Sequence, residues 1–157
     1  MKRILFVLSA FAVLLTVYSA APAKENHGHE HFSGPPHGGT PVQIGVHSFH
    51  LELVRDSEAG KFQAYVLDGH MEHYVAVSEK SFDLAAKTGT NQYRLIFQRV
   101  SPPGAAALPE KSSLFEAQGD WIKTTKNFDG VIPAITLGGK SFTNITFSFP
   151  KGTAHAH

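Results

Sequence analysis

The sequence predicts an all-β fold, an immunoglobulin-like antiparallel β-sandwich of about seven or eight strands with His-rich, disordered tails. Three observations lead to this prediction. Apolar residues alternate with polar ones in short runs, turn residues recur about every eight to twelve positions, and helical periodicity is nearly absent after residue 23. A small closed barrel fits the same pattern and is the alternative. The Cys-Trp-Cys hallmark of antibody domains is absent, so the prediction concerns architecture only.

Two hairpins define the expected strand order. In the first, the runs 49–54 and 62–67 flank a turn rich in Asp, Ser and Gly at 56–60. In the second, 131–137 and 142–149 flank Gly138-Gly139. Between the hairpins, shorter strands are expected at 74–77, 82–86, 93–100 and 114–117. Residues 101–111 contain three prolines and predict a loop, and Asp120 could cap a single helical turn over 121–126.

The N-terminus has the pattern of a secretory signal. Met1–Arg3 is basic, the run from Ile4 to Val17 is apolar, and Ala21 and Ala23 form a small-x-small cleavage site. An uncleaved membrane anchor normally needs about 20 apolar residues. We therefore expect residues 1–23 to be removed, leaving a periplasmic or secreted protein with no membrane attachment.

The mature chain is expected to form one domain with a tail at each end. Residues 24–41 are crowded with His, Gly and Pro and contain one large apolar side chain, Phe32. Such a segment buries too little apolar surface to offset its ordering entropy, and 151–157 resembles it. The predicted organisation is a disordered tail at 24–41, a β-sandwich domain at 42–150 and a His-containing C-terminal tail at 151–157.

Composition excludes several classes of function. Without the signal the chain has 12 basic and 13 acidic residues, so nucleic acid is an unfavourable partner. The absence of Cys removes disulfides, thiolate metal sites and catalytic thiols. There is no nucleophile elbow, no His-Glu-x-x-His motif and no phosphate-binding loop. We therefore predict a protein that is not an enzyme.

Histidine is the compositional anomaly, with 10 in the chain. Neutral imidazole is the commonest protein ligand for late transition metals, and imidazoles two residues apart in a flexible segment can close on one ion. The tails offer such spacing at His27, His29, His31, His155 and His157. With His and carboxylate ligands and no thiolate, the expected metal ion is Zn²⁺ or Cu²⁺, with Ni²⁺ and Co²⁺ as alternatives.

The predicted domain contains further candidate ligands. The segment between two expected strands, Asp68-Gly-His70-Met-Glu-His73, places two imidazoles in a loop, where ligand groups often gather. His50 and Glu52 share the outward face of their strand, about 7 Å apart by strand geometry. The remaining candidates are His37 and His47. The alternative for all of them is that they are solvated surface residues.

One part of the chain resembles a known module. The stretches HGGTPVQIG from His37, HLELV from His50 and YVLD from Tyr65, with Gly60 between them, resemble the His-rich N-terminal segment of periplasmic adaptor proteins of cobalt/zinc/cadmium efflux systems and small standalone periplasmic proteins. The resemblance covers about residues 37–73. It implies metal handling in the cell envelope, with a heavy-metal efflux complex as a candidate partner, and it carries no catalytic residues.

Two hypotheses from different classes follow. The first is a periplasmic transition-metal-binding protein that acts as buffer, chaperone or sensor in heavy-metal efflux. The second is a non-catalytic structural or interaction β-sandwich of the envelope, which pairs through an exposed strand edge and carries incidental His-rich tails.

Overall fold

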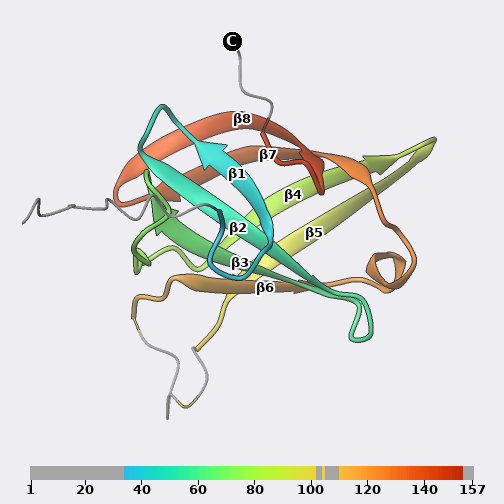
Figure 1. The fold of residues 1–157 in the computed structure, drawn as a ribbon, viewed down its shortest axis with the longest axis horizontal. Coiled ribbons are helices and arrows are strands. Elements are labelled where there is room, and N and C mark those ends of the chain that lie inside the picture. Colours follow the sequence, from blue (N-terminus) through green and yellow to red (C-terminus); the bar gives the residue numbers. More distant parts are fainter. Residues whose placement is uncertain (1–33, 102–103, 105–109, 154–157) are drawn as a thin grey trace, which may run out of the picture. The chain divides into compact units, whose positions relative to one another are not determined.

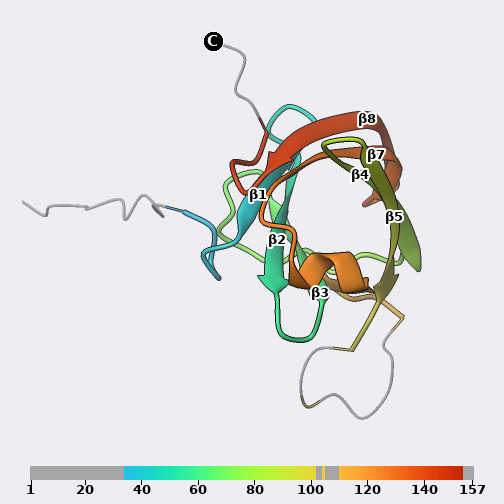
Figure 2. The same ribbon diagram turned by 90° about the vertical axis from the view of Figure 1, so that its right-hand side faces the viewer.

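The computed structural model describes residues 34–101, 104 and 110–153, and the prediction of an all-β fold is confirmed for them. Eight antiparallel strands form one sheet in the order β1-β2-β3-β6-β5-β4-β7-β8 (Figure 1). Their bounds are β1 Thr40–Ile44, β2 Phe49–Asp56, β3 Lys61–Asp68, β4 Ser81–Thr88, β5 Asn91–Arg99, β6 Leu114–Gln118, β7 Phe128–Leu137 and β8 Lys140–Phe149. The sheet curves around a common core (Figure 2). Among the described residues, no helix is long and apolar enough to cross a membrane.

Both predicted hairpins form. β2 pairs with β3 from Phe49↔Asp68 to Asp56↔Lys61, and β7 pairs with β8 around the Gly138-Gly139 turn. The turn glycines have φ of 58° and 78°, a left-handed backbone that glycine adopts without steric cost. Local alternation and turn chemistry were therefore enough to predict these two strand pairs.

Three local predictions differ from the structure. The strand expected at 74–77 is reduced to isolated bridges from Tyr74 to Leu67 and from Val77 to Ser112, because β6 pairs with β3 along most of its free edge. The helical turn is a 3₁₀ turn, Asp120–Lys123, so it is shorter than expected. Its cap position is occupied by the preceding glycine rather than by Asp120.

The ends of the described domain reach further than its predicted bounds. β1 begins at Thr40, so the boundary drawn at residue 42 falls inside a strand. Thr40 is buried and pairs with Leu53 of β2. At the other end, Gly152 exchanges two backbone hydrogen bonds with Ser148. Polar composition alone could not reveal these pairings, because backbone groups make them.

The first and last strands are joined by a seam, which we define as the hydrogen bonds between β1 and residues 150–153. Thr153 N–H donates to the carbonyl of Pro41 (3.2 Å), and the hydroxyl of Thr153 accepts from Gln43 N–H (2.9 Å). The Thr40 hydroxyl donates to the Pro150 carbonyl (3.1 Å). The segment after β8 thus satisfies polar groups that β1 would otherwise expose at the edge of the sheet.

The core is rich in phenylalanine. Phe62 meets Phe128 and Phe149 edge to face, with ring centroids 5.8 and 5.1 Å apart, and Phe128 stacks on Phe149 at 5.2 Å. Burial of each such side chain contributes about 1.5–3 kcal/mol. The 3₁₀ turn adds Trp121, which stacks on Tyr93 at 4.6 Å. This packing gives β2 and β3 a rigid base, on whose outer face the candidate site lies.

Candidate functional site: two carboxylate–imidazole pairs

The outer face of β2 carries a buried carboxylate. Alternation along the strand places Leu51 and Leu53 in the core and turns Glu52 to the opposite face, as the sequence predicted. An outward glutamate on an antiparallel strand is normally solvated. Glu52 is instead 0% exposed, so the expectation of a solvated side chain is wrong for this residue.

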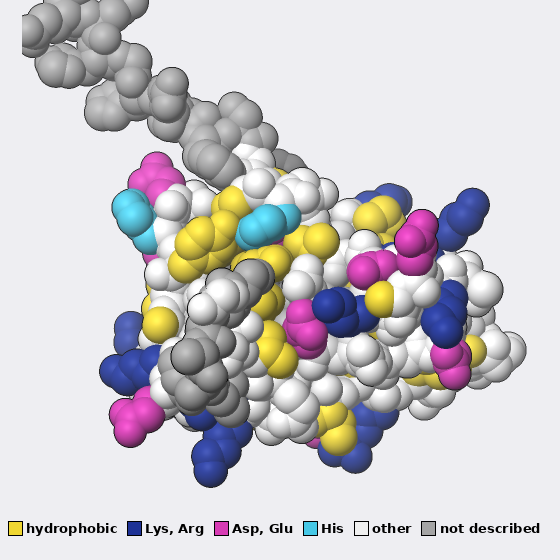
Figure 3. Space-filling view, turned by 90° about the horizontal axis from the view of Figure 1, so that it is seen from below, with side chains coloured by type: hydrophobic (Ala, Val, Ile, Leu, Met, Phe, Trp, Pro, Cys, Tyr) yellow, Lys and Arg dark blue, Asp and Glu magenta, His cyan; other side chains and the backbone are white. Residues whose placement is uncertain are grey.

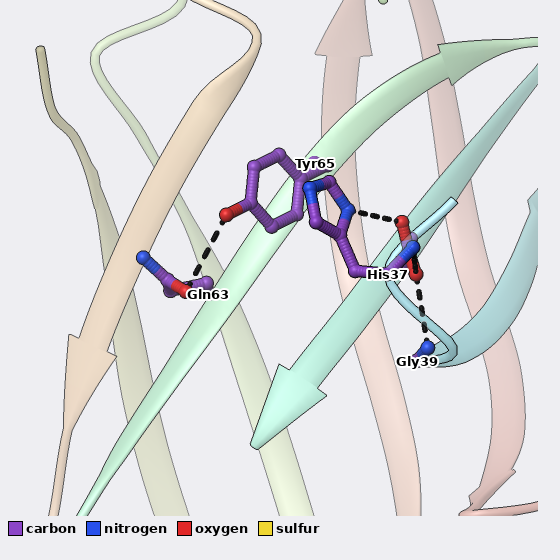
Figure 4. Close-up of polar contacts among 5 residues, drawn as sticks. His37, Gly39, Gln63 and Tyr65 are labelled. Carbon is purple, nitrogen blue, oxygen red and sulfur yellow. Dashed lines mark hydrogen bonds and ion pairs between the residues drawn. The ribbon is translucent and has the colours of Figure 1, made fainter. Parts of the chain in front are cut away.

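Residues 37–39, which we call the strap, lie over Glu52. The backbone N–H groups of His37 (2.7 Å) and Gly39 (2.9 Å) donate to Glu52 Oε1. The His37 ring nitrogen Nδ1 lies 2.8 Å from Glu52 Oε2 (Figure 4). A buried carboxylate is costly unless hydrogen bonds replace its water. The strap supplies three such hydrogen bonds, and these bonds hold residues 37–39 against β2.

Glycine is required at each of the two strap positions, 38 and 39, for a different structural reason. A Cβ on Gly39 would lie 2.7 Å from the Leu53 carbonyl oxygen and 2.8 Å from Glu52 Cγ, so only glycine lets the backbone lie this close to the sheet. Gly38 has open space around it but a φ of 68°, in the left-handed region. The His-Gly-Gly sequence therefore forms a bend that delivers two N–H groups and one imidazole to a single carboxylate.

Aromatic rings hold the His37 imidazole from the side. It stacks on Tyr65 with centroids 4.0 Å apart and planes 18° apart, and Tyr74 lies 6.0 Å away. The His37 side chain is still 35% exposed. Figure 3 shows a face of the molecule on which one histidine side chain lies among hydrophobic side chains. One edge of the ring thus meets the carboxylate while part of the ring stays open to solvent.

The two tyrosines are neutral neighbours. Burial raises the pKa of Tyr65, and repulsion from Tyr74 and Glu52 raises it further. Burial also raises the pKa of Tyr74, with a further contribution from Glu52. Because both phenols stay protonated at neutral pH, they act here as packing surfaces and not as phenolate ligands.

A row of polar side chains positions Tyr65. Its hydroxyl donates to Gln63 Oε1 (3.4 Å), and Gln63 Nε2 donates to Glu116 Oε1 (2.9 Å). Lys61 Nζ also contacts Glu116 Oε1, at 3.0 Å. The row links alternate outward residues of β3 to β6, so the stacking platform beneath His37 is tied to the sheet.

The loop after β3 contains a second pair. Asp68 Oδ1 accepts the backbone N–H of His70 (3.2 Å) and of Glu72 (2.9 Å), and Oδ2 lies 3.0 Å from His73 Nδ1. Burial would raise the pKa of Asp68, but the donors from Glu72, His73 and His70 together outweigh it and lower the pKa. The His73 side chain is 77% exposed. The predicted loop therefore exists, and a single aspartate organises it.

The remaining predicted ligands do not join these pairs into one centre. His50 is half-buried, and its Nδ1 lies 3.4 Å from the Asp68 carbonyl oxygen. His47 is exposed in the β1–β2 turn. Across residues 34–101, 104 and 110–153, no three His, Asp or Glu side chains are grouped closely enough to hold a metal ion together. The other predicted ligands, His27, His29, His31, His155 and His157, lie outside the described residues.

Sequence reasoning named both members of the first pair but did not bring them together. The strand register pairs Thr40 with Leu53, so a continued strand would carry residues 37–39 past Val54 and away from Glu52. The left-handed bend at Gly38 returns His37 to the carboxylate. That register could have been deduced only after β1 had been extended to Thr40. Two glycines between a histidine and a strand were the visible hint of close backbone approach.

The fold and the site define an all-β domain that holds one imidazole against a carboxylate on the outer face of β2 and a second in the loop after β3. Histidines that bind metals commonly donate their second ring N–H to a carboxylate, so each pair fits one metal ligand. Comparison with known proteins adds no assignment, since no protein-family model, curated protein or solved structure matches the chain.

Proposed function

We propose that the protein is an exported transition-metal-binding protein and that the imidazoles of His37 and His73 are ligands supplied by its fold. The observation that supports the proposal is that each ring has Nδ1 within hydrogen-bond distance of a carboxylate, at 2.8 and 3.0 Å. This arrangement orients the ring and makes Nε2 a better donor to a metal ion.

The chemistry of the donors favours borderline metal ions. Imidazole nitrogen with carboxylate suits Zn²⁺ or Cu²⁺, with Ni²⁺ and Co²⁺ as alternatives. Each ring supplies one bond, so further ligands must come from water or from other histidines of the chain. A bound ion would balance the negative charge of the carboxylate behind each ring. The residues themselves bind and orient the ion, and no reaction step is proposed.

The resemblance in the sequence supports a role in the cell envelope. Both pairs, His37 with Glu52 and Asp68 with His73, lie within the stretch of about residues 37–73 that resembles the N-terminal segment of efflux adaptors. We therefore propose a buffer, chaperone or sensor of metal ions that works beside a heavy-metal efflux complex. The signal-like N-terminus supports export to the periplasm.

The competing role, pairing through an exposed strand edge, has less support. The seam occupies the Pro41 carbonyl and the Gln43 N–H with partners from residue 153. Edge-to-edge pairing at this part of β1 would have to break those bonds.

Isothermal calorimetry with Zn²⁺ and Cu²⁺ on residues 24–157 tests the proposal. Because the five terminal histidines are also candidate ligands, the measurement is repeated on a chain in which all five are changed to Gln. We expect binding tighter than about 100 μM, and at least a tenfold loss in affinity when His37 and His73 are both changed to Ala. The matched control is His47→Ala, an exposed imidazole for which the described residues show no carboxylate contact. Binding weaker than about 100 μM in every chain, or equal affinity with and without His37 and His73, contradicts the proposal.

A further inference from the structure

We infer that Glu52 is a positioning residue: it fixes the tautomer of His37, so that the neutral ring carries its proton on Nδ1 and presents the lone pair of Nε2. The inference rests on the proposed function in one respect, because Nε2 matters as a donor only if a metal ion binds there. The tautomer itself can be measured without any metal.

The hydrogen-bond donors leave one arrangement for the neutral ring. A carboxylate can accept hydrogen bonds but has no proton to donate. Glu52 Oε1 already accepts two backbone N–H groups, from His37 and Gly39. Oε2 faces His37 Nδ1 at 2.8 Å, and because ionised Glu52 can only accept, Nδ1 is the donor of that bond. In a neutral imidazole the other nitrogen, Nε2, then holds the free electron pair.

The surroundings of the His37 ring disfavour a flip of the imidazole that would place a carbon atom against Glu52. Turning the imidazole over would replace Nδ1 by a carbon atom and leave Glu52 Oε2 without this partner inside a site that is 0% exposed. The stack on Tyr65 holds the ring plane, and the close contact of Gly39 with β2 holds the strap. The protein therefore selects both the orientation and the proton position of His37.

The second pair provides an internal contrast. Asp68 ends β3, His73 lies five residues later in the loop that follows, and the His73 side chain is 77% exposed. Water can replace Asp68 as the partner of that ring at little cost. We therefore expect the tautomer preference at His73 to be weaker than at His37, where the carboxylate is shielded from water.

Glu52→Gln tests the inference because it keeps the size of the side chain and changes the donors. If the amide oxygen still accepts the two strap N–H groups, the amide NH₂ faces His37 Nδ1. That nitrogen must then accept, and the proton moves to Nε2. The matched control is Glu116→Gln, the same substitution on the same outer face, where Lys61 and Gln63 are the partners instead of a histidine.

The experiment is long-range ¹H–¹⁵N NMR on histidine-labelled residues 24–157, recorded at increasing pH until the His37 ring signals stop changing. The His37 signals are assigned with His37→Ala. We expect the Nδ1–H form in wild type and in Glu116→Gln, and the Nε2–H form in Glu52→Gln. Subsequent Zn²⁺ titration should shift the His37 signals in wild type, with at least tenfold weaker binding at this ring in Glu52→Gln.

The outcomes separate the two proposals. An Nε2–H form or an equal mixture in wild type overturns the inference, and so does a Glu52→Gln protein that retains the Nδ1–H form. The expected tautomers together with His37 signals that do not respond to Zn²⁺ or Cu²⁺ support the inference and contradict the proposed metal role of this ring. If Glu52→Gln does not fold, the wild-type tautomer alone decides.

Discussion

The two carboxylate–imidazole pairs have similar geometry and opposite surroundings. Their contact distances are 2.8 Å for His37 with Glu52 and 3.0 Å for His73 with Asp68. The carboxylate of the first pair is 0% exposed, whereas that of the second is 31% exposed. An exposed pair is weakened by water and salt, while a buried one must be satisfied by its partners. Distance alone therefore says little about what each pair contributes to the fold.

The difference comes from sequence separation. His37 and Glu52 are 15 residues apart and meet only because β1 and β2 pair, whereas Asp68 and His73 are 5 apart within one loop. The first pair depends on tertiary structure and in return holds the strap in place. The second needs only a turn, so its loss should leave the sheet intact.

The largest expected effect is that of Glu52→Ala. It removes the acceptor of two backbone N–H groups and of the His37 ring, so the strap should detach and the free energy of unfolding should fall by about 3 kcal/mol. Urea unfolding followed by circular dichroism measures it. Asp68→Ala, the matched change in the exposed pair, should cost about 1 kcal/mol. Equal losses in the two variants would refute the contrast between buried and exposed pairs.

The second largest effect on the free energy of unfolding is expected when a methyl group is added to the strap. In Gly39→Ala the new Cβ would meet the Leu53 carbonyl and Glu52 Cγ at under 3 Å, so the strap must move away from the sheet. We expect a loss of about 2 kcal/mol in the free energy of unfolding, by the same measurement. Gly38→Ala has open space and only the cost of its positive φ, about 1 kcal/mol. A larger loss at Gly38 than at Gly39 would show that close packing is not what holds the strap.

Much of the fold was predictable from local sequence patterns. The two carboxylate–imidazole pairs show which features such patterns predict and which they do not. Alternation and turn residues predicted both hairpins, and the loop bearing His70 and His73 was predicted because it joins two expected strands. The burial of Glu52 was not predictable from β2 alone, since it depends on the strap that covers it. The pairing of β1 with β2 closes over the short turn at 45–48, but the bend at Gly38 that brings His37 onto Glu52 has no alternation pattern that predicts it.

A third prediction concerns acid pH. The folded-state pKa of Asp68 lies below its ordinary value of 3.8. The stabilisation by this carboxylate is therefore present above about pH 4 and lost as pH falls through the lowered pKa. Wild type should exceed Asp68→Asn in stability at pH 6 by at most about 1 kcal/mol, because the side chain is partly exposed. Urea unfolding of both proteins at pH 6 and near pH 2 should show this difference disappearing, and a difference that grows on acidification would have the wrong sign.

The smallest effect is expected at Met71, in the exposed loop. Its φ of 59° is unfavourable for a residue with a side chain, and Met71→Gly should relieve this strain. The greater freedom of glycine in the unfolded chain opposes the gain, which leaves about 0.5 kcal/mol of stabilisation. Thermal unfolding should therefore show a small rise in midpoint, with Gly69→Ala as the opposite control, because a Cβ there would lie 2.3 Å from the His47 carbonyl oxygen. A lower midpoint in Met71→Gly would mean that the methionine side chain contributes packing that outweighs the strain.

The seam has a consequence for the order in which the molecule folds. Thr40 and Pro150 are 110 residues apart in the chain, while each hairpin closes over a short turn. Non-local contacts form slowly, because loop-closure entropy is lost before they stabilise anything. We therefore expect the hairpins to form early and the seam late, after residues 150–153 have been synthesised. During that interval the β1 edge is unpaired, and it is then that the chain is most open to pairing with another copy.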